Sequence, residues 1–310
     1  MKLAKFLDAD ASPRVGVVTD QQLIPLQLDT RAASLADILS SESPIELAES
    51  LLESSKNSGT AIPLGDSVSN DAFPSDTDPN DSVQWLPPID EQEVWAAGVT
   101  YRRSQTARME ESEAAASCYD QVYNAERPEI FFKATAHRVA GHLQDLRIRG
   151  DATWNVPEPE ITLVLSNQLK IVGLTIGNDM SSRDIEGENP LYLPQAKCYD
   201  QCAGLGPWVT LYPSLPEPAD IKVALRINRG DDTIFEQNTS ADQMAREFAD
   251  LVGWLGRDNS FPNGAFLMTG TGIVPTNEFT LQAEDWIHIS ITGIGTLSNR
   301  VVQNPFPKNS

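Results

Sequence analysis

Cysteine and histidine are scarce in this chain, with three of each among 310 residues. An odd number of cysteines in a chain of this length gives no disulfide framework. Cys198 and Cys202 have no partner pair at the spacing of zinc ligands, so a zinc site is not expected. His137 and His142 follow a predicted strand and are expected to be surface hydrogen-bonding residues rather than catalysts.

Basic residues are also few, with 23 Lys and Arg against 44 Asp and Glu. The net charge of −21 and an isoelectric point near 4.4 argue against nucleic acid and anionic membranes as partners, because both would be repelled. No apolar run approaches the roughly 18 residues that a membrane-spanning helix needs. The start of the chain, Met1–Ala4, lacks a signal-peptide core, so we expect a cytoplasmic protein.

Hydrophobic residues are plentiful, at 40 % of the chain, which is ample for a buried core. Residues 2–28 alternate as short strands and residues 35–52 have helical spacing, which predicts a small α+β unit. Residues 54–82 are rich in Ser, Asn, Asp, Gly and Pro and are expected to form a polar linker. We predict a small N-terminal domain over 1–88 and a catalytic domain of many strands and few helices over 89–310.

Two glutamates share one face of a predicted strand in the middle of the chain. Prolines at 157 and 159 keep the backbone extended, and the residues after Glu160 are strand formers. Side chains of a strand point to the same face at every second position, so Glu158 and Glu160 lie on one face. The apolar run 171–178 predicts the next strand, and Asp179 ends it. A third carboxylate is therefore within reach of the first two.

Three clustered carboxylates repel one another unless a cation lies among them. Ligation by oxygen alone suits Mg²⁺, with Mn²⁺ or Ca²⁺ as alternatives. The spacing fits a second interpretation equally well, in which Glu158 and Glu160 lie on a solvated strand face and Asp179 caps a helical turn. The carboxylate pattern by itself leaves both interpretations open.

The polar segment that follows favours the metal site. It reads SSRDIEGENPLYLPQAK over 181–197, and a Gly-x-Gly-Pro turn follows at 204–207. Together with the E-x-E pair and Asp179, this segment resembles the fumarylacetoacetate hydrolase family, and within it the 2-keto-3-deoxy-arabinonate dehydratase-like branch. The matching motifs extend over residues 95–275, so the resemblance covers most of the chain.

The resemblance implies a mixed β-roll catalytic fold in which Glu158, Glu160 and Asp179 bind the divalent metal. It also places Lys197 at the site, where a desolvated lysine near a cation can act as the base at C3 of the substrate. The substrate-binding residues that it implies are Lys133 in an F-x-K-x-T segment, Arg183, and Thr271 in a Gly-Thr turn. Family members commonly pair their catalytic domains, so a homodimer or homotetramer is expected.

A helix predicted over 104–117 carries three glutamates, of which Glu111 is the candidate catalytic acid or base. A polar helix face is the alternative explanation for these glutamates. Residues 102–104 are Arg-Arg-Ser, where the hydrolase branch carries an acidic ligand or a His-containing dyad, and this departure counts against a water-activating hydrolase. A second helix, with an apolar face, is predicted over 241–255.

Together with these residues, the resemblance implies a magnesium-dependent dehydratase that converts a 2-keto-3-deoxy-pentonate to 2,5-dioxopentanoate and water. A metal that chelates the 2-oxo acid would assist deprotonation at C3 and loss of the C4 hydroxyl. The alternatives are an acylpyruvate or fumarylpyruvate hydrolase, an oxaloacetate decarboxylase, and a non-catalytic protein that binds a 2-oxo acid. In every case the expected partner is a small 2-oxo acid.

Overall fold

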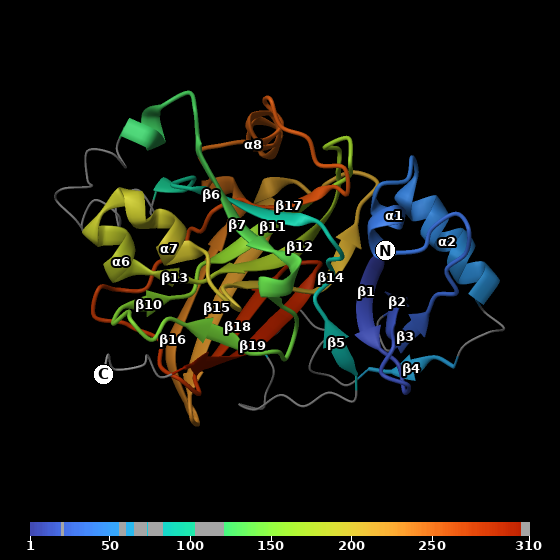
Figure 1. Ribbon diagram of the computed structural model, residues 1–310, viewed down its shortest axis with the longest axis horizontal. Helices are drawn as coiled ribbons and strands as arrows, with labels where there is room; N and C mark the ends of the chain where they lie inside the picture. The colour runs from blue at the N-terminus through green and yellow to red at the C-terminus, as the bar shows by residue number, and fades with distance from the viewer. Residues whose placement is uncertain (20–21, 56–59, 65–72, 74–82, 103–120, 305–310) are drawn as a thin grey trace, which may run out of the picture.

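The computed structural model describes residues 1–19, 22–55, 60–64, 73, 83–102 and 121–304. Within these ranges the chain forms one large sheet, a five-stranded sheet packed against it, and a two-stranded ribbon, with short helices around them (Figure 1). The predicted α+β class is confirmed. The predicted helix 104–117, with Glu111, and most of the predicted linker 54–82 lie outside the described residues.

The described part of the N-terminal region contributes five strands and two helices. The strands are β1 (Lys2–Leu7), β2 (Pro13–Val18), β3 (Gln22–Pro25), β4 (Ile62–Pro63) and β5 (Gln84–Leu86). The helices, α1 (Leu35–Leu39) and α2 (Pro44–Ser55), lie beside these strands (Figure 1). Ser34 caps α1 by accepting a hydrogen bond from the Asp37 N–H at 3.1 Å. Because β1 also pairs with β14 (Ala203–Leu211), the sheet continues past residue 88, and the domain boundary there stays a prediction.

The large sheet runs in the order β4-β3-β2-β1-β14-β12-β11-β17-β6-β7. Its other strands are β6 (Glu93–Gly98), β7 (Glu129–Thr135), β8 (Val139–Ala140), β11 (Pro159–Leu165), β12 (Ile171–Asp179) and β17 (Ala265–Met268). Every residue of β11 and β14 is buried, because both faces of these central strands are covered. The strands predicted around the glutamate pair therefore lie at the centre of the sheet.

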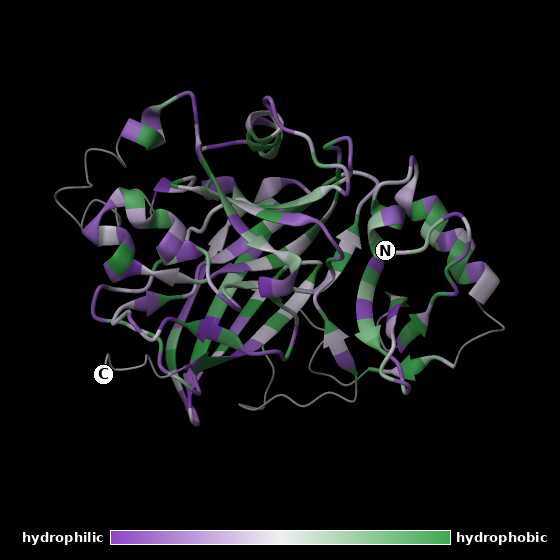
Figure 2. Ribbon diagram, in the orientation of Figure 1, coloured by the Kyte–Doolittle hydropathy of each residue, from purple (hydrophilic) through white to green (hydrophobic). Residues whose placement is uncertain are grey.

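The five-stranded sheet has the order β16 (Asp232–Ser240), β15 (Lys222–Arg229), β18 (Trp286–Ile291), β19 (Gly295–Gln303) and β9 (Leu146–Ile148). Its apolar side chains join those of the large sheet in one core, which includes Ile176, Trp208, Ile289 and Leu297. Full burial of one such aliphatic side chain contributes about 1.5–3 kcal/mol. Figure 2 shows apolar colour along many of the strands, with hydrophilic colour in the connecting loops and on parts of the short helices.

The helix predicted over 241–255 is shorter in the structure. Ala241–Gln243 form a 3₁₀ turn, η4, and α8 spans only Phe248–Leu255. The segment between them is held by the Ala245 N–H, which donates to the Thr100 carbonyl at 2.8 Å. The prediction was wrong for the first part of the range, because helical spacing of apolar side chains does not report this long-range backbone bond.

Several further elements are short. They are β10 (Asn155–Val156) paired with β13 (Ser181–Ser182), the helices α6 (Arg183–Glu188) and α7 (Leu193–Lys197), and the 3₁₀ turns η1 (Ala136–Arg138), η2 (Pro190–Tyr192) and η3 (Pro218–Asp220). Figure 1 shows α6 and α7 next to the start of β7. Among the described helices, none is long and apolar enough to cross a membrane.

Candidate active site

Three carboxylates meet where β11 and β12 run side by side. The antiparallel pairing sets Pro159 opposite Asn178, and the Asp179 N–H donates to the Glu158 carbonyl at 3.0 Å. This register brings Asp179 next to the face from which Glu158 and Glu160 project. One oxygen of each carboxylate lies within 4.8 Å of the others, and all three residues are buried. The alternative of a solvated strand face is therefore wrong.

Among the described residues, three buried cationic side chains contact this acidic trio of Glu158, Glu160 and Asp179. Lys197 Nζ lies 2.7 Å from Glu158 Oε2 and 2.8 Å from Asp179 Oδ2. Lys133 Nζ lies 2.6 Å from Asp179 Oδ1. The Arg183 guanidinium donates from Nη2 to Glu158 Oε1 at 2.7 Å. The structure thus brings together the carboxylates and three of the other residues that the sequence proposed, as expected for a buried charged site.

Two short helices position the cations that follow β13. Arg183 is the first residue of α6, and its N–H donates to the Trp154 carbonyl at 2.7 Å, which anchors the start of the helix. Lys197 is the last residue of α7, where the partial negative charge of the helix end favours a cation. Its Nζ also lies 2.6 Å from Ser181 Oγ in β13. The polar segment 181–197 therefore folds over the site as one unit.

Glu160 is fully buried, and its pKa is raised well above the usual value. Burial is the main cause, and the charges of Asp179 and Glu158 add to it. Lys197 and the Gly270 N–H, which lies 2.6 Å from Glu160 Oε2, lower the pKa in part. Gly270 has a φ of 92°, and a Cβ there would collide with a neighbouring side chain, so glycine permits this close approach of the amide.

The donor set of the acidic trio fits a divalent cation. A cation among the three carboxylates would offset the repulsion and burial that raise the pKa of Glu160. Carboxylate oxygens are the ligands of hard cations such as Mg²⁺, Mn²⁺ and Ca²⁺. The described residues that line the adjacent cavity include no Cys or His, so a zinc-type ligand set is not formed there.

A cavity of about 20 Å³ opens beside the acidic trio. In addition to the trio, Arg183 and Lys197, it is lined by Ala97, Gly98, Val99, Glu129, Phe131, Glu186, Gly270 and Thr271. Glu129 and Glu186 add two carboxyl groups to the wall that are not part of the trio. The cavity therefore combines candidate metal ligands with candidate acids and bases.

Glu129 is a cavity residue that the sequence analysis missed. It pairs with Gly98 across β7 and β6, and a Cβ at Gly98 would collide with Glu129 Oε2. The missing Cβ leaves room for the carboxyl group on the cavity side of the sheet. A signal was present in the sequence, because Glu129 lies two and four positions before Phe131 and Lys133, and strand alternation favours one face for all three.

Two predicted residues have weaker structural support. Thr271 lines the cavity, but its Oγ accepts a hydrogen bond from the Ile273 N–H at 3.1 Å, so its contact with a substrate stays a prediction. The catalytic role of Glu111 also stays a prediction, since that residue lies outside the described part of the chain.

The expectation of a surface position for His142 was wrong. His142 is buried, with its ring edge-on to Trp85 at a centroid distance of 6.3 Å. Its Nδ1 accepts the Ser298 N–H at 3.0 Å, and burial lowers its pKa to about 3. His137 is exposed, as predicted. Neither histidine is among the residues that line the acidic cavity.

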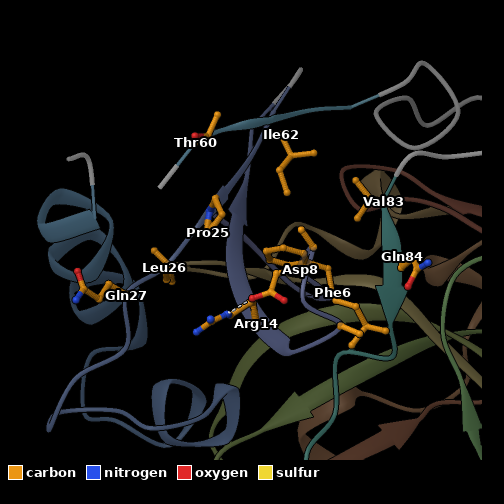
Figure 3. A pocket seen from close by; sticks show the side chains of 13 residues that line it. Phe6, Asp8, Arg14, Pro25, Leu26, Gln27, Thr60, Ile62, Val83 and Gln84 are labelled. Carbon is orange, nitrogen blue, oxygen red and sulfur yellow. Dashed lines mark hydrogen bonds and ion pairs between the residues drawn. The ribbon is translucent and has the colours of Figure 1, made fainter. Parts of the chain in front are cut away.

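A larger cavity, of about 750 Å³, lies in the N-terminal region (Figure 3). Among the described residues that line it, the charged ones are Asp8 and Arg14, which pair with each other at 2.7 Å. Figure 3 shows this pair beside apolar side chains such as Phe6 and Leu26. This cavity lacks the convergence of acids, bases and potential ligands that marks a reaction site.

Comparison with known proteins gives a consistent result. A family model described as fumarylacetoacetate (FAA) hydrolase C-terminal matches residues 93–302. A probable 2-keto-3-deoxyxylonate dehydratase of Haloferax volcanii is 47% identical over 214 residues, which cover 69% of this chain and 73% of that protein. A 2-dehydro-3-deoxy-D-arabinonate dehydratase of Saccharolobus solfataricus is 42% identical over 213 residues, 68% of this chain and 72% of that protein.

The fold also matches a solved structure over nearly its whole length. That structure is 2-keto-3-deoxy-D-arabinonate dehydratase complexed with magnesium and 2,5-dioxopentanoate. The two share 30% sequence identity with a TM-score of 0.78, and the match covers 99% of this chain and 100% of the other. The similarity therefore includes the N-terminal region as well as the stretch matched by the family model.

Proposed function

The chain belongs to the fumarylacetoacetate hydrolase family, and from this premise we propose that it is a magnesium-dependent dehydratase of 2-keto-3-deoxy sugar acids. The reaction converts a 2-keto-3-deoxy-pentonate to 2,5-dioxopentanoate and water. The observation that carries this proposal is the buried acidic trio, whose ligand atoms lie within 4.8 Å of one another beside a cavity. The two dehydratases that share 47% and 42% of their aligned residues with this chain support the same substrate class.

Glu158, Glu160 and Asp179 would hold the cation. When bound, Mg²⁺ supplies a Lewis acid that polarises the 2-oxo acid and acidifies the hydrogens on C3. Arg183 and Lys133, both buried at the trio, provide positive charge near the substrate carboxylate, which the negative field of the chain would otherwise repel. The binding step thus depends on local cations inside an acidic protein.

Three groups are candidates for the proton transfers. Lys197, with Nζ between Glu158 and Asp179, is the proposed base at C3, and it must lose a proton before it can accept one. Glu129, on the cavity wall, is the competing candidate base and otherwise the acid that protonates the leaving C4 oxygen. Glu111 keeps this acid role as a prediction from the sequence.

The elimination releases one molecule of water from the substrate. The C3–H bond and the C4–O bond break, a C3–C4 double bond forms, and the C4 hydroxyl leaves with the proton that the acid supplies. Protons then shift from C5 and its hydroxyl to C3 and C4, which turns the allylic alcohol into the C5 aldehyde. Side chains on the cavity wall that exchange protons at C3 and C4 serve both stages.

The alternatives use the same carboxylates differently. A hydrolase of acylpyruvates or fumarylpyruvate needs an activated water, and the described cavity wall holds no histidine to prepare it. An oxaloacetate decarboxylase and a non-catalytic 2-oxo acid binder remain as rivals. Mn²⁺ and Ca²⁺ are the alternative cations. A cytoplasmic homodimer or homotetramer is part of the proposal and depends on the family resemblance.

The test is a dehydration assay on five- and six-carbon 3-deoxy-2-oxo acids, with and without EDTA, in which aldehyde formation is measured. The proposal expects aldehyde from the five-carbon acid, loss of the activity with EDTA, and recovery with added Mg²⁺. Faster turnover of fumarylpyruvate or oxaloacetate than of any 3-deoxy acid would support a rival enzyme. Ligand binding without turnover of any of these acids would support the non-catalytic binder.

A further inference from the structure

A second cavity adjoins the one beside the acidic trio. The first measures about 20 Å³, which is room for roughly one water or ion. The second measures about 290 Å³. Glu129 and Glu186 line both, so the second cavity begins at the outer wall of the first. A molecule bound to the trio can therefore extend past these two carboxyl groups into the larger space.

The second cavity has a polar end and an apolar wall. Its polar end is the shared pair of glutamates. The remaining lining residues are Val122, Arg127, Pro128, Pro190 and Leu193. The Arg127 guanidinium lies over the Trp254 ring, 4.6 Å from its centre, so part of its charge faces an aromatic surface. Such a space fits a short carbon chain whose hydroxyl lies at the polar end.

We propose, building on the dehydratase function, that this second cavity takes the substrate chain beyond C3 and that Leu193 limits its length. Pockets that take small molecules measure roughly 300–1,000 Å³, so the 20 Å³ beside the trio cannot hold a whole five-carbon acid. With the carboxylate and oxo group at the trio, C4 and its hydroxyl lie at Glu129 and Glu186, and C5 lies against Leu193 and Pro190. Leu193 and Lys197 are the two ends of α7, so one short helix carries both the length-limiting side chain and a residue of the reaction site.

Shortening the wall tests the assignment. In Leu193→Ala, the ratio of kcat/KM for a six-carbon to a five-carbon 3-deoxy-2-oxo acid is expected to rise about tenfold, the usual effect of one or two methylenes in an apolar pocket. Leu191→Ala is the matched control, because Leu191 is 83% exposed two positions away and does not line either cavity. The control is expected to keep the wild-type ratio within about twofold.

A larger side chain at position 193 tests the same assignment by filling the second cavity. In Leu193→Trp, KM for the five-carbon acid is expected to rise about tenfold, while the affinity for pyruvate in the presence of Mg²⁺ is unchanged, because pyruvate has no carbon beyond C3. Circular dichroism establishes that each variant is folded. An equal loss of affinity for pyruvate and for the five-carbon acid would overturn the placement of the substrate chain. It would mean that Leu193→Trp disturbs the acidic site itself.

Titration of the Mg²⁺-loaded protein with 2-oxo acids of three to six carbons separates this inference from the dehydratase function, because binding requires no turnover. A wild-type protein that binds these acids but dehydrates none refutes the dehydratase function, and the Leu193 variants then still report chain placement through their affinities. An active dehydratase whose length preference is the same in both Leu193 variants as in wild type refutes the second cavity as the chain site. No binding of any 2-oxo acid refutes both.

Discussion

Lys197 and Asp179 form a buried ion pair, with 2.8 Å between Nζ and Oδ2, at the centre of the candidate site. The same ammonium group is shared with Glu158, so one cation neutralises part of two candidate metal ligands. A divalent ion that binds these carboxylates competes with the ammonium for them. The lysine therefore influences both the affinity of the site for a cation and the proton transfers that follow.

Replacing Lys197 with methionine separates these two effects. The variant is expected to lose at least about 100-fold in kcat, because a proton-transfer group is gone. Its affinity for Mg²⁺ is expected to be unchanged or higher, since no ammonium competes for Glu158 and Asp179. Steady-state kinetics and calorimetric titration with Mg²⁺ measure the two quantities. Full activity in this variant would contradict a catalytic role for Lys197 and leave Glu129 as the candidate base at C3.

Glu160→Gln tests the metal site directly. The change removes one charged ligand, so Mg²⁺-dependent dehydration is expected to fall by more than about 100-fold, beyond the usual effect of an outer-shell change. The fold is expected to persist, because the glutamine Oε1 can still accept the Gly270 N–H and a neutral group is easier to bury than the carboxylate whose pKa is raised. Mg²⁺ titration and thermal unfolding check both parts. Retained turnover would refute the metal role of Glu160.

Gly98→Ala tests the position of Glu129. A methyl group at Gly98 would collide with Glu129 Oε2, so the carboxyl group must swing away from its place on the cavity wall. The expected result is a loss of about 10–100-fold in kcat with little change in Mg²⁺ affinity, because the acidic trio is untouched. Glu129→Gln should show a similar or larger loss. A variant Gly98→Ala with wild-type kcat would indicate that Glu129 takes no part in the proton transfers.

Much of the acidic trio could be predicted from local sequence. Glu158 and Glu160 are two residues apart on one strand, and Asp179 ends the next strand, so strand alternation and a simple antiparallel pairing already favour their convergence. The sequence did not decide whether the strand face that carries Glu158 and Glu160 is buried. The residue pattern of such a face can be the same whether water or protein covers it. Only the central place of β11 in the large sheet decides that question.

Other features depend on contacts between distant segments. The pairing of β6 with β7 sets Glu129 opposite Gly98. No feature near either residue in the sequence predicts this pairing. The hydrogen bond from the Ala245 N–H to the Thr100 carbonyl is a second contact between distant segments, and α8 begins only after it. His142 is buried because Trp85 and β19 pack around it, although its loop looks polar in the sequence. Such outcomes follow from tertiary packing, which overrides local propensity.

The buried histidines predict how stability changes with pH. His142 and His288 both contact Ser298, and burial lowers their pKa values to about 3 and about 4. Both values lie below the roughly 6.5 of an unfolded chain, so the folded protein holds the imidazoles neutral where the unfolded chain takes up protons. The stability that this neutral state provides is therefore present above about pH 6.5 and is lost as the pH falls towards 4.

The free energy of unfolding is accordingly expected to decrease on acidification, with each histidine contributing a slope of roughly 1.4 kcal/mol per pH unit. His288→Gln should remove one such contribution and flatten the slope between about pH 6 and pH 4.5. His137→Gln is the matched control, because that side chain is exposed and its change should leave the slope as in wild type. Denaturant titrations at several pH values in this window measure the slopes. Identical slopes for His288→Gln and wild type would mean that the imidazole binds its proton without unfolding, which the packing around Ser298 opposes.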